Sequence, residues 1–339
     1  YGLEKDIVPR AGYPLELISV QYIRRTLSLD LVKTGFVALK GLGQSLGIVR
    51  RFKPHVVVGT GGYVAGPVLL AAALSRVPTF IQEQNAFPGI TNRLLGRFAS
   101  GIALGYAEAE RYFPRDGRVI VTGNPIRSEI AAISKREGIQ RLNLRPDHRT
   151  IVVFGGSQGG LSINRAMRAL APRLKSEPRL QVIHQTGQKS YGAIAREVLG
   201  LSDQGTEDLP PSVQDGCIRI VPYIYDMPAA LAAADLVVGR AGALSIAEIT
   251  VRGLPAVLIP FPYAAENHQE KNARVLEQAG AARVILDRDV NGDSLGACIF
   301  ELLGDPSLLA QMAAASKKLG RADATQVIVD RIAELAGWS

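Results

Sequence analysis

Residues 150–167 read TIVVFGGSQGGLSINRAM, and this stretch decides the fold. An apolar run enters a glycine-rich turn and then a segment of helical spacing, which predicts a strand, a tight turn and a helix in succession. Residues 55–75 repeat this order, because HVVV precedes GTGGYVAGP and an Ala- and Leu-rich stretch. Further apolar runs alternate with helical segments at 180–185, 218–221, 235–239, 255–260 and 282–286. The alternation predicts an α/β protein with two doubly wound, Rossmann-like parallel sheets.

The two glycine turns predict two domains of similar architecture. The segment TGNPIR at 122–127 contains a proline, and the polar stretch RLNLRPDHR at 141–149 follows it. We therefore expect an N-terminal domain over residues 1–133 and a C-terminal domain over residues 150–320, with a ligand cleft between them. The last helical stretch, within residues 321–339, precedes no further strand and is compatible with packing back across either domain.

Composition narrows the class of protein. A chain of 339 residues with 47% hydrophobic and 21% charged residues is neither fibrous nor disordered. Two cysteines without metal or disulfide spacing favour a reducing, cytoplasmic location. There is no apolar run long enough for a membrane span and no signal-peptide pattern. The chain opens with YGLEKD, which is typical of the interior of a loop, so we expect an N-terminal truncation.

The net charge of +8 lies mostly in the first part of the chain, where residues 1–133 carry 16 basic and 9 acidic residues. Residues 20–53 interleave basic and apolar side chains, a pattern that suits either a helix on an anionic membrane surface or a core helix with a charged outer face. The basic residues are Arg24, Arg25, Lys33, Lys40, Arg50, Arg51 and Lys53. Nucleic acid is not an expected partner, because no recognition motif is present.

Glycine turns that open helices present backbone N–H groups to phosphates. Neither turn matches the dinucleotide fingerprint or the P-loop. Within residues 235–270, a helix beginning near Ala243 suits a diphosphate, and the Glu248 carboxylate suits either a ribose diol or a solvated helix face. The acidic pair in Asp287-Arg288-Asp289 suits a cation or, more simply, a solvated loop, and we favour the loop.

Six segments together resemble the MurG family. They are GTGGYVAGP (59–67), EQNAFPGITNRLL (83–95), GNPIR (123–127), FGGSQGG (154–160), GRAGALSIAEI (239–249) and PYAAENHQEKNA (262–273). This family comprises bacterial transferases that move N-acetylglucosamine (GlcNAc) from UDP onto the lipid-linked muramyl-pentapeptide precursor of peptidoglycan. The resemblance implies a GT-B fold and a peripheral enzyme of cell-wall synthesis on the cytoplasmic side of the cell membrane. It places the acceptor on the first domain and the donor mainly on the second.

The resemblance also implies the donor contacts. Ser157 and the helix start would hold the diphosphate, Glu248 the ribose and the Ile224 backbone the uracil. Gln269 and Asn85 would contact the sugar, and Arg127 completes the set. The helix-start residues are Ala243, Leu244, Ser245, Ile246 and Ala247. The implied reaction is an inverting displacement by the muramyl 4-hydroxyl, with an anionic membrane surface nearby and no cofactor or metal.

The sequence departs from the family pattern near its start. The family's first loop, of the type GGTGGH, has no match, so we expect the chain as given to lack one βα unit and to be impaired. Gln82 stands where the family often has His, and Glu83 is then the only nearby acid or base. A UDP-GlcNAc 2-epimerase, another GT-B sugar transferase and a non-catalytic nucleotide-sugar-binding fragment remain as alternatives, although the EQN and GNPIR segments argue against the two other enzymes.

Overall fold

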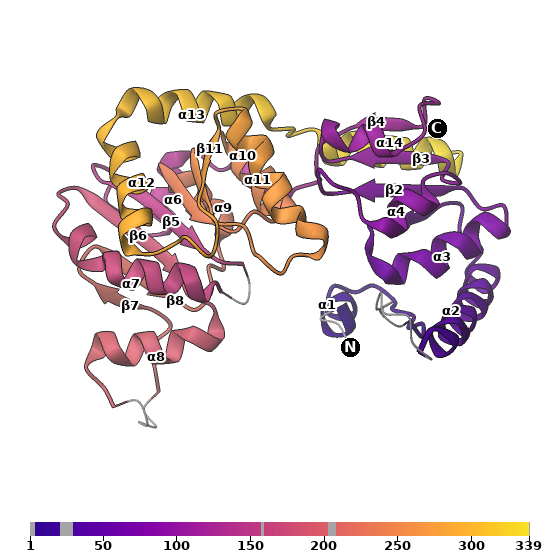
Figure 1. Ribbon diagram of the computed structural model, residues 1–339, viewed down its shortest axis with the longest axis horizontal. Helices are drawn as coiled ribbons and strands as arrows, with labels where there is room; N and C mark the ends of the chain where they lie inside the picture. Colours follow the sequence, from indigo (N-terminus) through magenta and orange to yellow (C-terminus); the bar gives the residue numbers. More distant parts are fainter. Residues whose placement is uncertain (1–3, 21–29, 157–158, 203–207, 339) are drawn as a thin grey trace. The chain divides into compact units, whose positions relative to one another are not determined.

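The computed structural model describes residues 4–20, 30–156, 159–202 and 208–338, and the chain forms two compact units (Figure 1). The first unit consists of residues 1–84, 88–121 and 326–339, and the second consists of residues 85–87 and 122–325.

The first unit contains a four-stranded parallel sheet in the order β1-β2-β3-β4. Its strands are β1 (Val57–Gly59), β2 (Thr79–Glu83), β3 (Gly101–Leu104) and β4 (Val119–Val121). Its helices are α1 (Glu4–Arg10), α2 (Asp30–Phe52), α3 (Gly62–Leu74), α4 (Ile90–Leu95), the 3-10 helix η1 (Ala107–Tyr112) and most of α14 (Ala324–Ala336).

Both faces of this sheet are covered by helices. Side chains alternate between the two faces of a strand, and in β2 Ile81 packs with Leu69 of α3 while its neighbour Phe80 packs with Ile328 of α14. Leu335 of α14 also packs against this second cluster. The C-terminal helix therefore belongs to the core of the first unit, which decides the position that the sequence left open.

The second unit contains a seven-stranded sheet in the order β11-β10-β9-β5-β6-β8-β7, which is parallel except for β7. The strands are β5 (Arg149–Phe154), β6 (Leu180–Gln185), β7 (Val213–Asp215), β8 (Ile218–Val221), β9 (Leu236–Gly239), β10 (Ala256–Leu258) and β11 (Ala282–Val284). The helices are α5 (Ser128–Ala132), α6 (Lys135–Arg141), α7 (Leu161–Lys175), α8 (Gln188–Leu199), α9 (Met227–Ala233), α10 (Ala243–Arg252), η2 (Ala265–Asn267), α11 (His268–Gln278), α12 (Gly292–Gly304) and α13 (Pro306–Leu319).

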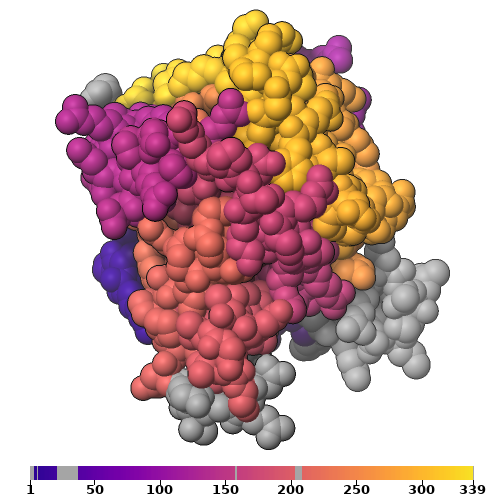
Figure 2. All heavy atoms as spheres, turned by 90° about the vertical axis from the view of Figure 1, so that its left-hand side faces the viewer, coloured from indigo at the N-terminus to yellow at the C-terminus, as the bar shows by residue number. Residues whose placement is uncertain are grey.

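The chain starts this sheet at its centre and winds in both directions. Ile151 and Val153 of β5 pack with α7, α8 and α12 in one large apolar cluster, and α9 contacts β5 as well. Figure 2 shows one face of the molecule, with α12 and α13 in amber and the region around β7 and β8 in salmon below them. The prediction of an α/β protein with two parallel-sheet units is confirmed, and the strands of the first sheet follow one another in chain order.

The boundary between the units differs from the predicted one. The first unit gives way to the second after Val121, whereas we expected its domain to continue to residue 133. The reason is packing of α5 and α6 on the second unit. A Cβ on Gly138 of α6 would lie 2.5 Å from the Ala229 carbonyl oxygen of α9, and Arg252 of α10 donates to the carbonyls that end α5. Lys135 also forms an ion pair with Asp235.

Candidate functional site

The carboxyl ends of the second unit's parallel strands carry its polar turns, as expected for a ligand site in an open α/β sheet. After β5, the glycine turn folds back tightly: a Cβ on Gly159 would lie 2.0 Å from the Thr186 carbonyl oxygen, and φ at Gly159 is +79°. Only glycine fits there. The predicted contact Ser157 lies outside the described residues.

The second turn, between β9 and α10, leads into an uncapped helix start. Gly242 is the N-cap residue, and no side chain of the described residues caps it. The first intrahelical hydrogen bond runs from the Ile246 N–H to the Gly242 carbonyl. The N–H groups of Ala243, Leu244 and Ser245 therefore have no partner within the helix, which is the geometry that binds phosphate at helix starts.

Glu248 lies farther along α10, and its side chain is 19% exposed. Burial raises the pKa of its carboxyl, and the positive charge of Arg127 partly opposes this effect. The Arg127 Nη2 lies 3.8 Å from the Glu248 Oε1. The structure thus brings together two predicted donor contacts from segments 121 residues apart, and the carboxylate retains acceptor capacity for hydroxyl groups. Ile246 is buried in the helix, whereas Leu244 is exposed.

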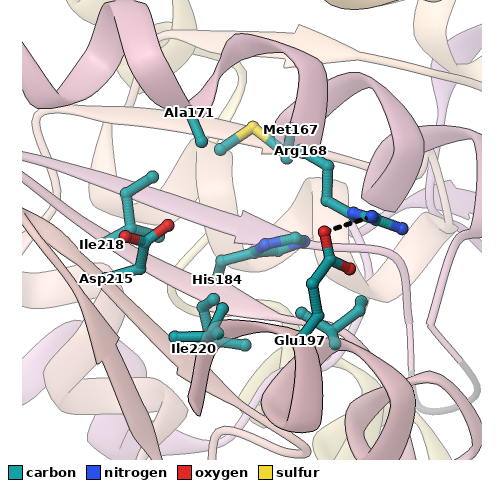
Figure 3. A pocket seen from close by; sticks show the side chains of 10 residues that line it. Met167, Arg168, Ala171, His184, Glu197, Asp215, Ile218 and Ile220 are labelled. Atoms are coloured by element: carbon teal, nitrogen blue, oxygen red, sulfur yellow. Dashed lines mark hydrogen bonds and ion pairs between the residues drawn. The ribbon is translucent and has the colours of Figure 1, made fainter. Parts of the chain in front are cut away.

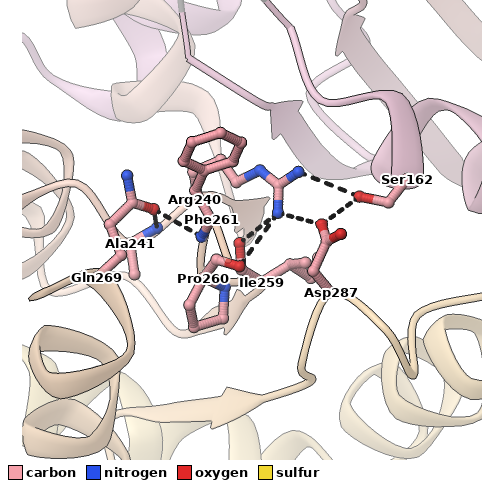
Figure 4. Close-up of polar contacts among 8 residues, drawn as sticks. All are labelled: Ser162, Arg240, Ala241, Ile259, Pro260, Phe261, Gln269 and Asp287. Carbon is pink, nitrogen blue, oxygen red and sulfur yellow. Dashed lines mark hydrogen bonds and ion pairs between the residues drawn. The ribbon is translucent and has the colours of Figure 1, made fainter. Parts of the chain in front are cut away.

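Gln269 of α11 joins the turn after β9 to the segment after β10 (Figure 4). Its Oε1 accepts hydrogen bonds from the Ala241 N–H at 3.2 Å and from the Phe261 N–H at 3.0 Å. Two N–H donors fix the orientation of the amide, because the reverse orientation would set donors against donors. No described residue accepts a hydrogen bond from its Nε2, so Gln269 offers a ligand a donor.

A buried arginine that the sequence analysis did not identify connects four elements at this edge (Figure 4). Arg240 Nη1 donates to the carbonyls of Ile259 and Pro260 and to Asp287 Oδ1, and its Nη2 donates to Ser162 Oγ. Ser162 also donates to Asp287 Oδ1. The Asp287 carboxylate, which we considered for a cation, is therefore held by Arg240, and the Asp289 carboxylate lies 3.6 Å from Arg288. The described residues contain no group of three or more His, Cys, Asp or Glu suited to a metal ion.

Asn85 reaches this region through a second residue that the sequence analysis missed, Asn272 of α11. The Asn272 Oδ1 accepts from the Ala86 N–H at 2.9 Å, and its Nδ2 donates to Asn85 Oδ1 at 3.1 Å. Asn272 is fully buried, and its Nδ2 also approaches the Ala241 carbonyl at 3.5 Å. Lys271 lies over the Phe87 ring. Residues 85–87 are thereby fixed beside the turn that begins α10.

Ile224 lies in the loop after β8, and its side chain is buried. This burial is compatible with the predicted contact, because that contact uses only the main chain. Its N–H already donates to Gln185 Oε1 at 2.9 Å. Only the Ile224 carbonyl is therefore left to pair with a base in this structure. The pairing of the Ile224 backbone with uracil stays a prediction, and in this structure it would use the Ile224 carbonyl as the acceptor.

Glu83, the candidate base, lies in the first unit at the end of β2 and is buried. Its Oε2 accepts from the Gly89 N–H at 3.1 Å and from Asn92 Nδ2 at 2.8 Å. These bonds suit a carboxylate that positions residues 89–92. A catalytic role for Glu83 stays a prediction. Gln82, its neighbour, is buried in the same strand.

The turn before α3 in the first unit also has special geometry. Gly61 and Gly62 have φ values of +94° and +75°, and Gly61 is the N-cap of α3 without a side-chain cap. A Cβ on Gly59 would lie 2.4 Å from Leu69. The predicted order of strand, glycine turn and helix is confirmed here.

The basic amphipathic segment forms α2, but Arg24 and Arg25 lie outside the described residues. Gly41, Ser45 and Val49 form a buried face at helical spacing, and α2 packs against α3. Leu39, Lys40, Arg50 and Arg51 are exposed on the other sides of the helix, and Phe52 is exposed at its C-terminal end. The exposed surface of α2 thus combines cations with large apolar side chains, as membrane-surface helices do. No described helix meets the length and hydropathy that a membrane span requires.

A small cavity of about 90 Å³ lies apart from these turns, between α7, α8 and β8 (Figure 3). His184 lines it, is buried, and donates through Nε2 to Asn164 Oδ1 at 3.0 Å. Burial lowers the His184 pKa to about 4. Arg168 and Glu197 form an ion pair at the rim. A neutral, hydrogen-bonded histidine among apolar side chains is a core residue.

Sequence comparison identifies the class of protein. A sequence model of the glycosyltransferase family 28 C-terminal domain matches residues 150–328, and one of the family 28 N-terminal domain matches residues 1–104. Both describe glycosyltransferases, in agreement with two parallel-sheet units and paired glycine turns.

Individual relatives narrow this class. The chain is 47% identical over 335 residues to the UDP-N-acetylglucosamine–N-acetylmuramyl-(pentapeptide) pyrophosphoryl-undecaprenol N-acetylglucosamine transferase of Moorella thermoacetica, covering 98% of this chain and 87% of the relative. It is 45% identical to the enzyme of the same name from Desulforamulus reducens, over 97% and 86% of the two chains. The crystal structure of Acinetobacter baumannii MurG matches with a TM-score of 0.71 and 30% identity, over 98% of this chain and 88% of that one.

The chain belongs to the MurG family of glycosyltransferases, and it has the GT-B fold. A Staphylococcus aureus structure described as an MnaA-UDP co-structure shares the fold at 17% identity with a TM-score of 0.65.

Proposed function

We propose that this protein transfers GlcNAc from UDP-GlcNAc to the 4-hydroxyl of a lipid-linked muramyl-pentapeptide, with inversion at the anomeric carbon. The observation that carries the proposal is the identity of 45–47% over nearly the whole chain to transferases named for this reaction. The epimerase alternative is not favoured, because the structural neighbours described as epimerases are 14% identical and share only the fold. The non-catalytic alternative is not favoured, because the relatives at 45–47% identity are named as transferases.

The second unit supplies the donor contacts in this proposal. The N–H groups that α10 leaves unpaired at its start would receive the diphosphate, and the nearby Glu248 would accept from the ribose hydroxyls. The Ile224 carbonyl would accept from uracil, and the Gln269 Nε2 would donate to the sugar or phosphate. Asn85, held by Asn272, and Arg127 would complete the pocket around the transferred sugar.

The chemical step is a displacement in which the muramyl hydroxyl oxygen forms a bond to the anomeric carbon as the bond to the UDP oxygen breaks. Negative charge then grows on the departing diphosphate. The α10 N–H groups and the positive end of that helix stabilise this charge, since they are already oriented before the reaction begins. The hydroxyl proton leaves to a basic group or to water as the new bond forms.

The acceptor carries a lipid, and we infer that the first unit binds it at the cytoplasmic surface of the cell membrane. Exposed Leu39 and Phe52 on α2, with Arg50 and Arg51 beside them, support contact with anionic lipid. A second exposed patch supports the same role. It surrounds a cavity of about 570 Å³ lined by Ile90, Arg93, Leu94, Arg97 and Arg111.

The reaction is tested by incubating the purified chain with UDP-GlcNAc labelled in the sugar and a lipid-linked muramyl-pentapeptide in detergent. We expect labelled lipid and UDP in equal amounts, and a large loss of transfer for Glu248→Gln but not for Glu301→Gln, an exposed change on α12. UDP release without acceptor would indicate an epimerase or hydrolase instead. Binding without turnover would indicate a non-catalytic protein.

Membrane binding is tested separately by sedimentation with vesicles that contain anionic lipid. Arg50→Gln with Arg51→Gln is expected to reduce binding, and added salt is expected to reduce it further. The matched control changes two exposed cations of the second unit, Arg288→Gln with Lys318→Gln. Equal loss in both double variants, or binding that ignores lipid charge, would contradict the proposed role of α2.

A further inference from the structure

Gln185, the last residue of β6, bridges the two loops on either side of its strand. It is 2% exposed. Its Nε2 donates to the Gly156 carbonyl at 2.8 Å, and its Oε1 accepts from the Ile224 N–H at 2.9 Å. A carbonyl on one side and an N–H on the other fix the orientation of the amide, because the flipped form would lose both hydrogen bonds.

The position of β6 in the sheet explains this bridge. β6 lies between β5 and β8, so its carboxyl end separates the glycine turn that follows β5 from the loop that follows β8. The next residue reinforces the arrangement, because the Thr186 N–H donates to the Val221 carbonyl and its own carbonyl accepts from Asn164. Gly156 itself has φ of +85°, so this turn depends on a conformation that most residues avoid.

We propose that Gln185 is a positioning residue that makes the donor site selective for uracil over cytosine. The inference rests on the proposed function, in which the Ile224 backbone meets the base. With its N–H donated to Gln185, Ile224 presents only a carbonyl, which accepts a hydrogen bond. Uracil carries a hydrogen on N3 and can donate to that carbonyl, whereas N3 of cytosine is an acceptor and would face it without a hydrogen bond.

The same amide connects base recognition to the phosphate turn. Gln185 binds the Gly156 carbonyl and the Ile224 N–H at the same time, so it fixes the position of Gly156 relative to the Ile224 loop. Loss of the bridge would free the Ile224 N–H, which could then satisfy cytosine N3, and it would loosen both loops. A site that hydrogen-bonds its ligand discriminates strongly only while its own polar groups are fixed.

Two variants separate the two hydrogen bonds. Gln185→Met has similar length and makes neither bond, whereas Gln185→Glu keeps an acceptor for the Ile224 N–H but, when ionised, has no donor for Gly156. The matched control is Gln181→Met on the same strand. Gln181 is also buried, and its amide bonds the Arg145 N–H and carbonyl at the opposite edge of the sheet.

The experiment measures the dissociation constants of UDP and CDP by calorimetry and the KM and kcat for UDP-GlcNAc. It also measures the Tm of each protein without UDP. For Gln185→Met we expect about a tenfold weaker UDP affinity, a UDP-over-CDP preference reduced about tenfold and a raised KM with little change in kcat. Gln185→Glu should keep more of the base preference than Gln185→Met. Gln181→Met should lower Tm without changing the UDP-over-CDP preference.

An unchanged UDP-over-CDP preference in a folded Gln185→Met protein would overturn the inference. Equal loss of preference in Gln181→Met would do the same, since it would indicate general loosening. If the unmodified protein bound neither nucleotide, the proposed function would fail before Gln185 was tested.

Discussion

Replacing Arg240 with methionine tests whether its hydrogen bonds hold the donor edge of the second unit together. Methionine keeps much of the side-chain volume but removes the guanidinium. The change deletes bonds of 3.1 and 3.2 Å to the Ile259 and Pro260 carbonyls, 2.5 Å to Asp287 and 3.1 Å to Ser162. It also leaves the Asp287 carboxylate, which is 22% exposed, without its cation.

The size of the effect follows from this burial. Removing one partner of a mostly buried pair costs about 3–5 kcal/mol, because the remaining charge keeps its desolvation penalty. Because Asp287 is partly exposed, water offsets part of this penalty, so we expect the free energy of unfolding to fall by about 3 kcal/mol. Adding Asp287→Asn removes the unpaired charge and should recover about 1–2 kcal/mol of it.

Hydrogen exchange during urea unfolding measures this change in the second unit alone, using peptides from β9 and β10. Because the protein has two units, a single unfolding midpoint would mix their stabilities. UDP affinity of the variant should fall as well, since Ser162 and the turn after β9 lose a common anchor. A free energy of unfolding within 1 kcal/mol of the original, or no recovery in the double variant, would refute the reasoning.

Four further outcomes are expected. Glu248→Gln should weaken UDP binding about tenfold. Because burial raises the pKa of Glu248, its ionisation destabilises the folded state, so the variant should gain stability relative to the original protein as pH rises. Parallel curves of stability against pH for the two proteins would contradict this. The folded-state pKa of His184, about 4, lies below its unfolded value, so the original protein should lose about 2 kcal/mol of stability as pH falls from 7 to 5. His184→Gln should remove most of this loss. Urea titrations of both proteins at the two pH values test it. Gly159→Ala should abolish UDP binding and lower Tm, whereas Gly200→Ala, at a helix end with open space around it, should lower Tm only. Added EDTA should leave transfer unchanged, because helix N–H groups hold the diphosphate in the proposed mechanism, and loss of activity on chelation would contradict that.

Local patterns in the sequence predicted the repeating elements well. The apolar run at 180–185 coincides with β6, and the glycine turns open α3 and α7 as expected. The short strand β7 was missed because its three residues, Val-Gln-Asp, show neither an apolar run nor a clear alternation. The boundary was placed too late because α5 and α6 follow a proline-containing loop, while the contacts that assign them to the second unit come from distant helices.

The residues that organise the candidate site were harder to find. Arg240, Asn272 and Gln185 bind partners 19 to 187 residues away, so no local sequence pattern indicates these contacts. A signal existed for Gln185 and Arg240, since each is a polar residue at the end of a buried strand. The Gln185 bond to Ile224 also could not be foreseen, because it depends on which strands become neighbours.

The position of α14 has a consequence for the order in which the protein matures. The core of the first unit includes Ile328 and Leu335, which pack with Phe80 and Gly101 on strands made far earlier. During synthesis, the first sheet must therefore wait with one apolar face uncovered until the whole second unit has emerged from the ribosome. The second unit can close first, and the uncovered face is where aggregation or chaperone binding would begin.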